Sequence, residues 1–157
     1  SLYKMTKKIF IIFFLSLLIS NCDYSPVYLK NNNLNYSINI IEASGDNEIN
    51  RSIIKDLNKQ SKNSSKKKFD IKINTNFSRN VLSRNAKGTA TDLELKATSL
   101  FIFKVNNKEQ AITIEERLNY KKLSNNYEQN NYEKTVKKNI ASSIARKLIL
   151  RLTILND

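Results

Sequence analysis

The feature that most constrains this chain is the alternation of apolar and polar residues in three successive segments between residues 69 and 120. A period of two places the alternating apolar side chains of a strand on one face. Each segment therefore predicts a strand with one apolar face, and the sheet that they form needs cover on one side only. The apolar positions are Phe69, Ile71, Ile73 and Phe77, then Leu93, Leu95, Ala97, Phe101, Phe103 and Val105, and finally Ile112, Ile114, Leu118 and Tyr120.

Two helical patterns can supply that cover. The first has its apolar residues on one face of about four helical turns and has Asp46 or Asn47 as its candidate N-cap. The second runs over residues 128–154 and is close to 40 Å long at about 1.5 Å per residue, which is enough to cross a sheet. The apolar positions are Ile49, Ile53, Ile54 and Leu57 in the first helix, and Tyr132, Val136, Ile140, Ile144, Leu148 and Leu152 in the second.

One more strand precedes the first helix, because Tyr36, Ile38 and Ile40 alternate with polar residues. Short connections between the three later strands indicate an antiparallel meander. The predicted order is β-α-β-β-β-α. This order is an α+β two-layer sandwich, with two helices on one face of an antiparallel or mixed four-stranded sheet. We expect it to form a single domain over residues 34–157.

The N-terminal segment has the pattern of a lipoprotein signal peptide. An apolar run over residues 9–19 follows two lysines and ends just before Cys22, the only cysteine. A bilayer-spanning helix needs about 20 apolar residues, whereas the core of a signal peptide needs roughly 7–15. We therefore predict a signal peptide over residues 1–21, with Met5 as the start of translation. We also predict lipid attachment at Cys22 and a tether over residues 22–33. The alternative for this cysteine is a buried or free thiol.

Composition excludes several kinds of chemistry. The chain has no histidine and one cysteine, so it cannot build a Ser-His-Asp or Cys-His nucleophile, a His-ligated metal site or an internal disulfide. We expect no metal and no cofactor. The remaining candidates for acid–base catalysis are the pairs Asp92 and Glu94, and Glu115 and Glu116. Nothing in the pattern predicts the burial that would tune one of them as an acid, so we expect no enzyme.

The net charge of +13 favours an anionic partner. The abundance of Lys, Asn and Ile together is also typical of an A/T-rich genome, which explains the charge equally well. An exported, lipid-anchored chain is not expected to meet nucleic acid. The expected anionic partner is therefore a lipid rather than DNA or RNA.

Three segments resemble the LptE family of lipopolysaccharide-assembly lipoproteins: "SPVY" shortly after Cys22, "LSRNAKGTATDLELKATSLFIF" (82–103), and residues 118–152. The resemblance implies a protein inside the lumen of an LptD-type β-barrel, on the periplasmic side of the outer membrane. There it would act as plug and assembly partner in lipopolysaccharide transport, without catalysis. Asn21 and Asp23 depart from the family pattern, and Asp23 leaves retention at the inner membrane as the alternative address.

The segment 78–88 combines cations with apolar side chains, which suits a phosphorylated, acylated glycolipid. The cations are Arg79, Arg84 and Lys87, and the apolar residues are Val81 and Leu82. We therefore predict a lipopolysaccharide contact at this hairpin. The alternatives are a solvated hairpin tip or a contact with the inner wall of the barrel. For the whole chain, the alternative function is a free-standing periplasmic lipid- or peptide-binding lipoprotein without a barrel partner.

Overall fold

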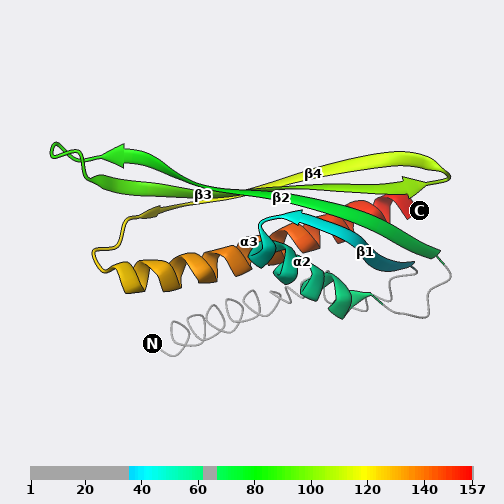
Figure 1. Ribbon diagram of the computed structural model, residues 1–157. Helices are drawn as coiled ribbons and strands as arrows, with labels where there is room; N and C mark the ends of the chain where they lie inside the picture. Colours follow the sequence, from blue (N-terminus) through cyan, green and yellow to red (C-terminus); the bar gives the residue numbers. More distant parts are fainter. Residues whose placement is uncertain (1–35, 62–66, 157) are drawn as a thin grey trace, which may run out of the picture. The chain divides into compact units, whose positions relative to one another are not determined.

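The computed structural model describes residues 36–61 and 67–156, which belong to one compact unit. The elements follow the predicted order β-α-β-β-β-α (Figure 1). They are β1 (Tyr36–Gly45), α2 (Asn47–Gln60), β2 (Lys67–Arg84), β3 (Ala90–Val105), β4 (Lys108–Lys121) and α3 (Asn126–Asn156). The predicted signal peptide, the tether and Cys22 lie outside the described residues.

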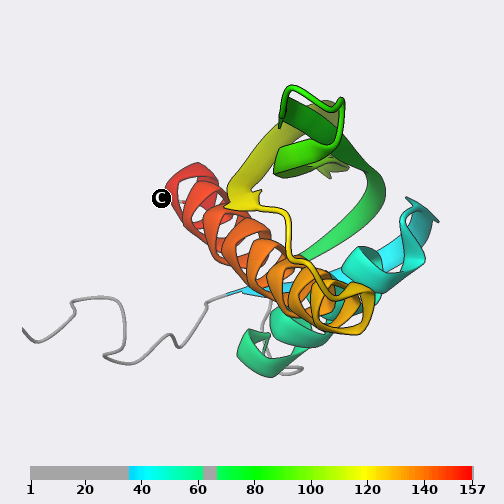
Figure 2. The same ribbon diagram turned by 90° about the vertical axis from the view of Figure 1, so that its left-hand side faces the viewer.

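The four strands form one mixed sheet in the order β1-β2-β3-β4. β1 runs parallel to β2 and is joined to it through α2, whereas β2, β3 and β4 form an antiparallel meander. α2 and α3 lie together on one side of the twisted sheet (Figure 2). The predicted α+β two-layer sandwich is therefore confirmed, in its mixed-sheet form.

The start of α2 is set by two residues. The Asp46 side chain accepts hydrogen bonds from the backbone N–H groups of Glu48 (3.1 Å) and Ile49 (2.9 Å), so Asp46 is the N-cap. Gly45 just before it has a φ of +87°, and a Cβ there would overlap the Thr75 carbonyl oxygen. That carbonyl accepts a hydrogen bond from Asp46 N (2.8 Å), so the close approach of the two backbones requires glycine.

The end of α2 is tied to the edge strand β1. The Ser61 N–H donates to the Leu57 carbonyl, and the Ser61 hydroxyl accepts from the Ile38 N–H at 2.9 Å. The chain therefore leaves α2 next to β1, the strand that precedes this helix in the sequence. Residues 62–66, between α2 and β2 in the sequence, are not described.

The core lies between the sheet and the two helices. Tyr36, Phe69 and Phe103 make successive edge-to-face contacts, with ring centroids 5.3 and 5.8 Å apart. The predicted stripe of α3 is buried from Val136 to Leu152, and its first member, Tyr132, is exposed. The register predicted for this helix is therefore confirmed over most of its length.

Several core positions differ from the expectation. Leu118 was expected on the apolar face of its strand but is 36% exposed in β4. Ile54 was expected on the apolar face of α2 but is only half-buried, because it lies at the margin of that face. In the sheet, Thr75 and Ser99 are fully buried opposite each other, and their hydroxyls are hydrogen-bonded at 2.7 Å. No helix of the described residues is long and apolar enough to cross a bilayer.

Candidate functional site: the projecting hairpin

The hairpin formed by β2 and β3 extends past the start of α3 (Figure 1). We call residues 78–93 the distal hairpin. From Arg79 to Thr89 every residue is exposed, in contrast to the alternately buried first half of β2. The pairing register shifts between Val81 and Ser83 and again between Ser83 and Arg84, which bends and twists this part of the strand.

The tip of the distal hairpin is closed by a small set of local hydrogen bonds. The Asn85 side chain accepts from the backbone N–H groups of Lys87 and Thr89, both at 3.0 Å. Arg84 donates to the Gly88 carbonyl at 2.8 Å, so its guanidinium is held at the turn. Gly88 has a φ of +79°, which favours glycine at this position.

The structure separates the three predicted cations. Arg84 and Lys87 are both exposed at the tip. Arg79 lies farther back on β2 opposite Leu95, on the face that meets the helices, and forms an ion pair with Glu133 of α3 at 3.1 Å. Arg79 therefore holds the base of the hairpin against α3, while the other two remain at the tip.

Glu133 is the centre of a polar cluster that we call the hairpin seat, which consists of Arg79, Tyr120, Gln129 and Glu133. Glu133 accepts hydrogen bonds from the Tyr120 hydroxyl (2.6 Å) and from the Gln129 amide (2.9 Å). The seat therefore joins β2, β4 and the first turns of α3.

The electrostatics of the seat keep Glu133 charged. Burial alone would raise the pKa of Glu133, but the hydrogen bonds from Tyr120 and Gln129 and the charge of Arg79 outweigh it and lower that pKa. Burial and the neighbouring carboxylate raise the pKa of Tyr120 well above its usual value, so the phenol remains a donor. The pattern Gln129 and Glu133, four residues apart on a helix, was the available sequence signal for this cluster.

Apolar side chains accompany the cations at the tip. Val81 and Leu82 are exposed large hydrophobic residues, and Leu82 occupies the position between the two paired residues Val81 and Ser83. The tip thus offers a guanidinium and an ammonium group beside exposed aliphatic carbon. That combination can contact an anionic group that is attached to hydrocarbon.

The four acids considered for catalysis each have identified partners. Asp92 accepts hydrogen bonds from Ser83 and Thr91, which lower its pKa. Glu94 accepts from Asn80 at 3.1 Å.

In β4, hydrogen bonds from Lys96 and Arg117 lower the pKa of Glu115 to about 2. Glu116 accepts from Ser143 (2.8 Å) and pairs with Lys147 of α3 (2.5 Å). Within residues 36–61 and 67–156, no three metal-ligating side chains come together.

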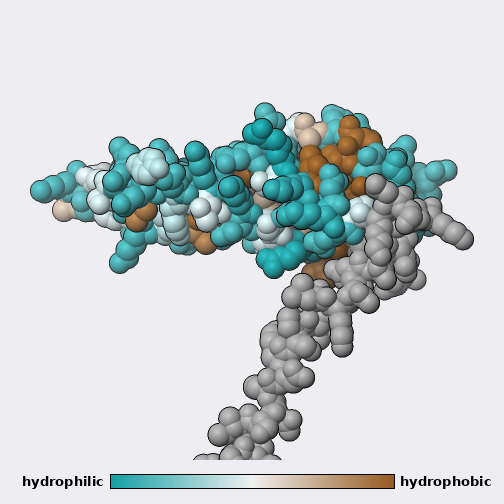
Figure 3. Space-filling model, turned by 90° about the horizontal axis from the view of Figure 1, so that it is seen from below, coloured by the Kyte–Doolittle hydropathy of each residue, from teal (hydrophilic) through white to brown (hydrophobic). Residues whose placement is uncertain are grey.

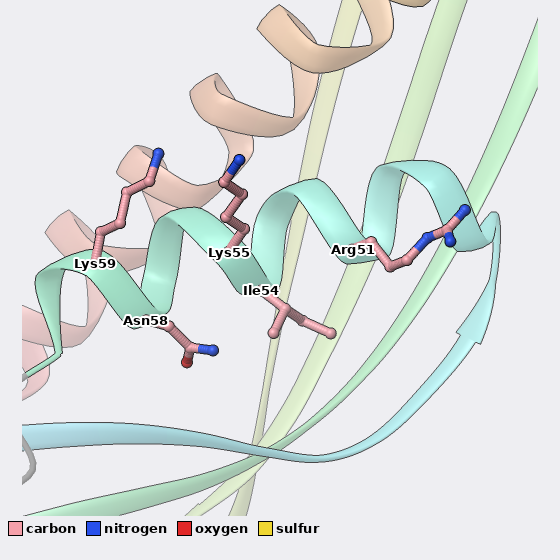
Figure 4. Close-up of a pocket in the computed structure, with 5 residues that line it drawn as sticks. All are labelled: Arg51, Ile54, Lys55, Asn58 and Lys59. Atoms are coloured by element: carbon pink, nitrogen blue, oxygen red, sulfur yellow. The ribbon is translucent and has the colours of Figure 1, made fainter.

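A shallow depression lies on the outer surface of α2 (Figure 4). Its lining among the described residues is Arg51, Ile54, Lys55, Asn58 and Lys59. Figure 4 shows Ile54 directed away from Lys55 and Lys59, whose amines point to the other side of the helix. The depression is wide open, so it lacks the concave walls of a small-molecule site.

Comparison with known proteins gives relatives by structure. No family model matches the sequence, and no curated protein matches it. The fold is similar to that of rare lipoprotein B from Shewanella oneidensis, with a TM-score of 0.55 and 18% identity over 75% of this chain and 96% of that chain.

Two further solved structures agree. A putative lipoprotein from Caulobacter crescentus gives a TM-score of 0.50 at 16% identity, over 75% of this chain and 88% of that one. The uncharacterized lipoprotein B from Nitrosomonas europaea gives 0.51 at 12% identity, over 78% and 87%. The fold is therefore one shared with bacterial lipoproteins, as the resemblance in the sequence predicts at the level of the fold.

Proposed function

We propose that this chain is an outer-membrane lipoprotein, anchored by lipid at Cys22, that plugs an LptD-type β-barrel and assists its assembly. In this role it takes part in the transport of lipopolysaccharide to the outer leaflet. The observation that carries the proposal is the fold, which matches rare lipoprotein B over nearly all of that chain. The sequence resemblance at residues 82–103 and 118–152, which include much of the distal hairpin and α3, supports the same assignment.

The shape of the described domain suits a protein that fits within another. The sheet face that the helices do not cover is polar. It carries ion pairs between neighbouring strands, such as Lys72 with Glu42 (2.8 Å) and Lys96 with Glu115 (2.8 Å). The distal hairpin projects from the packed part of the molecule and would reach farthest into the lumen of a barrel. Such a polar, elongated domain can be surrounded by a water-filled interior without a desolvation penalty for its charges.

For the lipopolysaccharide contact, we assign the grip to Arg84 and Lys87 with Val81 and Leu82. Arg79 is retained as the residue that fixes the direction of the hairpin, because it is paired with Glu133. Arg84 can donate two parallel hydrogen bonds to a phosphate if its bond to Gly88 is exchanged. The apolar pair would lie against the acyl chains.

The test is purification of the tagged chain from membranes in mild detergent. We expect a large β-barrel of the LptD type to co-purify, identified by mass spectrometry and by its shift in mobility when the sample is heated. Intact-mass analysis of the same sample should show acyl groups on a chain that begins at Cys22. The Cys22→Ala variant is the control, since it should lose the acyl mass and leave the membrane while its melting temperature remains that of the parent.

Two results would contradict the proposal. A chain that purifies alone, with bound lipid or peptide, would favour the free-standing periplasmic lipoprotein. A mass equal to the uncut chain would refute lipid attachment at Cys22. Fractionation of the inner and outer membranes shows which of the two contains the protein, a question that Asp23 leaves open.

A further inference from the structure

The last two turns of α3 expose large hydrophobic side chains. Leu150, Ile154 and Leu155 are 46%, 72% and 45% exposed, although their neighbours Leu148 and Leu152 are fully buried against the sheet. Leu150 and Ile154 are one turn apart and therefore lie on the same outward ridge of the helix. The burial of the core does not account for this second apolar ridge.

Cations flank the ridge. Arg146 and Arg151 are exposed, and neither makes an ion pair with an acid of the described residues. We call Arg146, Leu150, Arg151, Ile154 and Leu155 the α3-terminal surface. A helix face with exposed aliphatic side chains between arginines is the pattern of a segment that lies in the interface of an anionic bilayer.

The surrounding elements add charge of the same sign. By strand register, the beginning of β2 and the turn between β3 and β4 lie at the same end of the sheet as Tyr36 (Figure 1). The cations that they contribute are Lys67, Lys68, Lys104 and Lys108, and the acids are Asp70 and Glu109. This end of the domain therefore carries a net positive charge, which attracts anionic headgroups.

The chain enters the described domain beside the α3-terminal surface. The Tyr36 hydroxyl donates to the Ile149 carbonyl at 3.1 Å and lies 2.9 Å from the Thr153 hydroxyl, so the first residue of β1 contacts the last turns of α3. The 14 residue-to-residue steps from Cys22 to Tyr36 can span at most about 50 Å. The tip of the distal hairpin, at Arg84, is displaced from this entry point by the length of β2, about 56 Å at 3.3 Å per residue.

We propose that the α3-terminal surface is a second membrane contact, which lies on an anionic bilayer beside the lipid anchor. The proposal rests on lipid attachment at Cys22, as given above. The anchor holds this end of the domain near the bilayer, the aliphatic side chains enter the interface, and the two arginines pair with lipid phosphates. One end of the domain then rests on the membrane surface, and the tip of the distal hairpin lies at the opposite end of the domain.

The chain contains no tryptophan, so single tryptophans are clean probes. Ile154→Trp places the probe on the α3-terminal surface, and Tyr127→Trp is the matched control at an exposed position in the first turn of the same helix. Each acylated protein, verified by intact mass, is reconstituted in vesicles of phosphatidylglycerol with brominated phosphatidylcholine. We expect the emission of Ile154→Trp to be blue-shifted and quenched about twofold, and that of Tyr127→Trp to be unchanged.

A second variant tests the role of charge. Adding Arg146→Glu and Arg151→Glu to Ile154→Trp should abolish most of the quenching in the anionic vesicles, and raising the salt should weaken quenching of the parent probe. Circular dichroism melting confirms that each variant is folded. Equal quenching in the charge-reversed variant would overturn the assignment of the arginines.

The outcomes separate this proposal from the anchor. Acylated protein that sediments with vesicles but leaves Ile154→Trp unquenched would overturn the α3-terminal contact and keep the anchor. Protein without acyl groups would refute the anchor. Quenching of Ile154→Trp by added vesicles would then still show whether the α3-terminal surface contacts the bilayer. A blue shift in native membranes without quenching by brominated lipid would assign the surface to a protein partner and overturn the membrane contact.

Discussion

The two halves of β2 differ in the burial of their side chains. In the first half, Phe69, Ile71 and Ile73 alternate with exposed polar residues and are buried under the helices. In the second half, the strand continues into the distal hairpin, and every residue of β2 from Arg79 onward is exposed. Figure 3 shows hydrophobic residues gathered in the half of the molecule opposite the hairpin.

The two halves of this strand therefore have different roles. The packed half stabilises the domain, because burying a large aliphatic or aromatic side chain contributes roughly 1.5–3 kcal/mol. The distal hairpin contributes little burial, so its side chains can change at a small cost in stability. The hairpin seat lies at the boundary and transmits the orientation of the packed half to the hairpin. Substitutions in the packed half should therefore change the free energy of unfolding more than substitutions at the tip of the hairpin.

The largest effect is expected for Ile144→Asp. Ile144 is completely buried in the middle of α3, and an unpaired carboxylate there should cost several kcal/mol. Thermal unfolding followed by circular dichroism should show loss of most of the cooperative transition. Asn139→Asp, at an exposed position of the same helix, is the control and should melt close to the parent. Equal melting of the two variants would mean that the packed half is not defined by this stripe.

The two glycines allow a direct comparison of the halves. Both have positive φ, but a Cβ at Gly45 would overlap the Thr75 carbonyl, whereas a Cβ at Gly88 would meet no atom within 4 Å. Gly88→Ala should therefore cost only the conformational strain of about 1–2 kcal/mol. Gly45→Ala should cost more, because the backbones of β1 and β2 also have to separate. Chemical denaturation of both variants measures the difference, and a larger loss for Gly88→Ala would reverse the comparison.

The hairpin seat should give a pH-dependent effect of intermediate size. The pKa of Glu133 is lowered from 4.5 in the folded protein, so its ionised form stabilises the fold above pH 4.5, and this contribution is lost as the pH falls through the folded pKa. Glu133→Gln should cost about 1 kcal/mol near pH 7.

The difference in the free energy of unfolding between Glu133→Gln and the parent should narrow as the pH falls below 4.5. Denaturation at a series of pH values measures this difference. Glu128→Gln, at the exposed start of α3, is the control. A gap that is constant with pH would exclude the carboxylate as the source of the stabilisation.

The smallest effect on stability is expected at the tip. The double variant Arg84→Glu, Lys87→Glu should change the free energy of unfolding by about half a kcal/mol or less. Lipopolysaccharide binding, measured by calorimetry, should weaken about tenfold and lose its salt dependence. The matched control Lys134→Glu, Lys138→Glu makes the same change of charge on α3 and should bind nearly as well as the parent. An equal loss in both variants would mean that net charge alone, and not the tip, attracts the lipid.

The sequence was sufficient for the elements, because each is encoded by a local pattern. The candidate N-caps Asp46 and Asn47 predicted the start of α2, and Asp46 takes that position. The four-residue stripe that begins at Tyr132 predicted the face of α3 that is buried from Val136 to Leu152. The direction of β1 relative to β2 was left open, since nothing local determines whether the chain crosses over through α2 to a parallel neighbour.

The role of Arg79 could not be predicted in the same way. The sequence places Arg79, Arg84 and Lys87 together in one basic segment. The structure shows that Arg79 faces α3, because the strand alternates and because Glu133 lies 54 residues away on a helix whose position depends on the whole core. Pairs of this kind depend on tertiary packing, and they are not visible as a spacing in the sequence.

The buried hydroxyl pair in the sheet also affects how the long hairpin finds its alignment. Thr75 and Ser99 face each other across β2 and β3, and they interrupt otherwise apolar rows on both strands. A slip of two residues preserves which faces are apolar, so hydrophobic patterning alone cannot reject it. After such a slip, however, each hydroxyl would face an apolar neighbour and lose its partner, at a cost of about 1–3 kcal/mol for each buried group. The two hydroxyls therefore favour the native register of this hairpin over registers shifted by two residues.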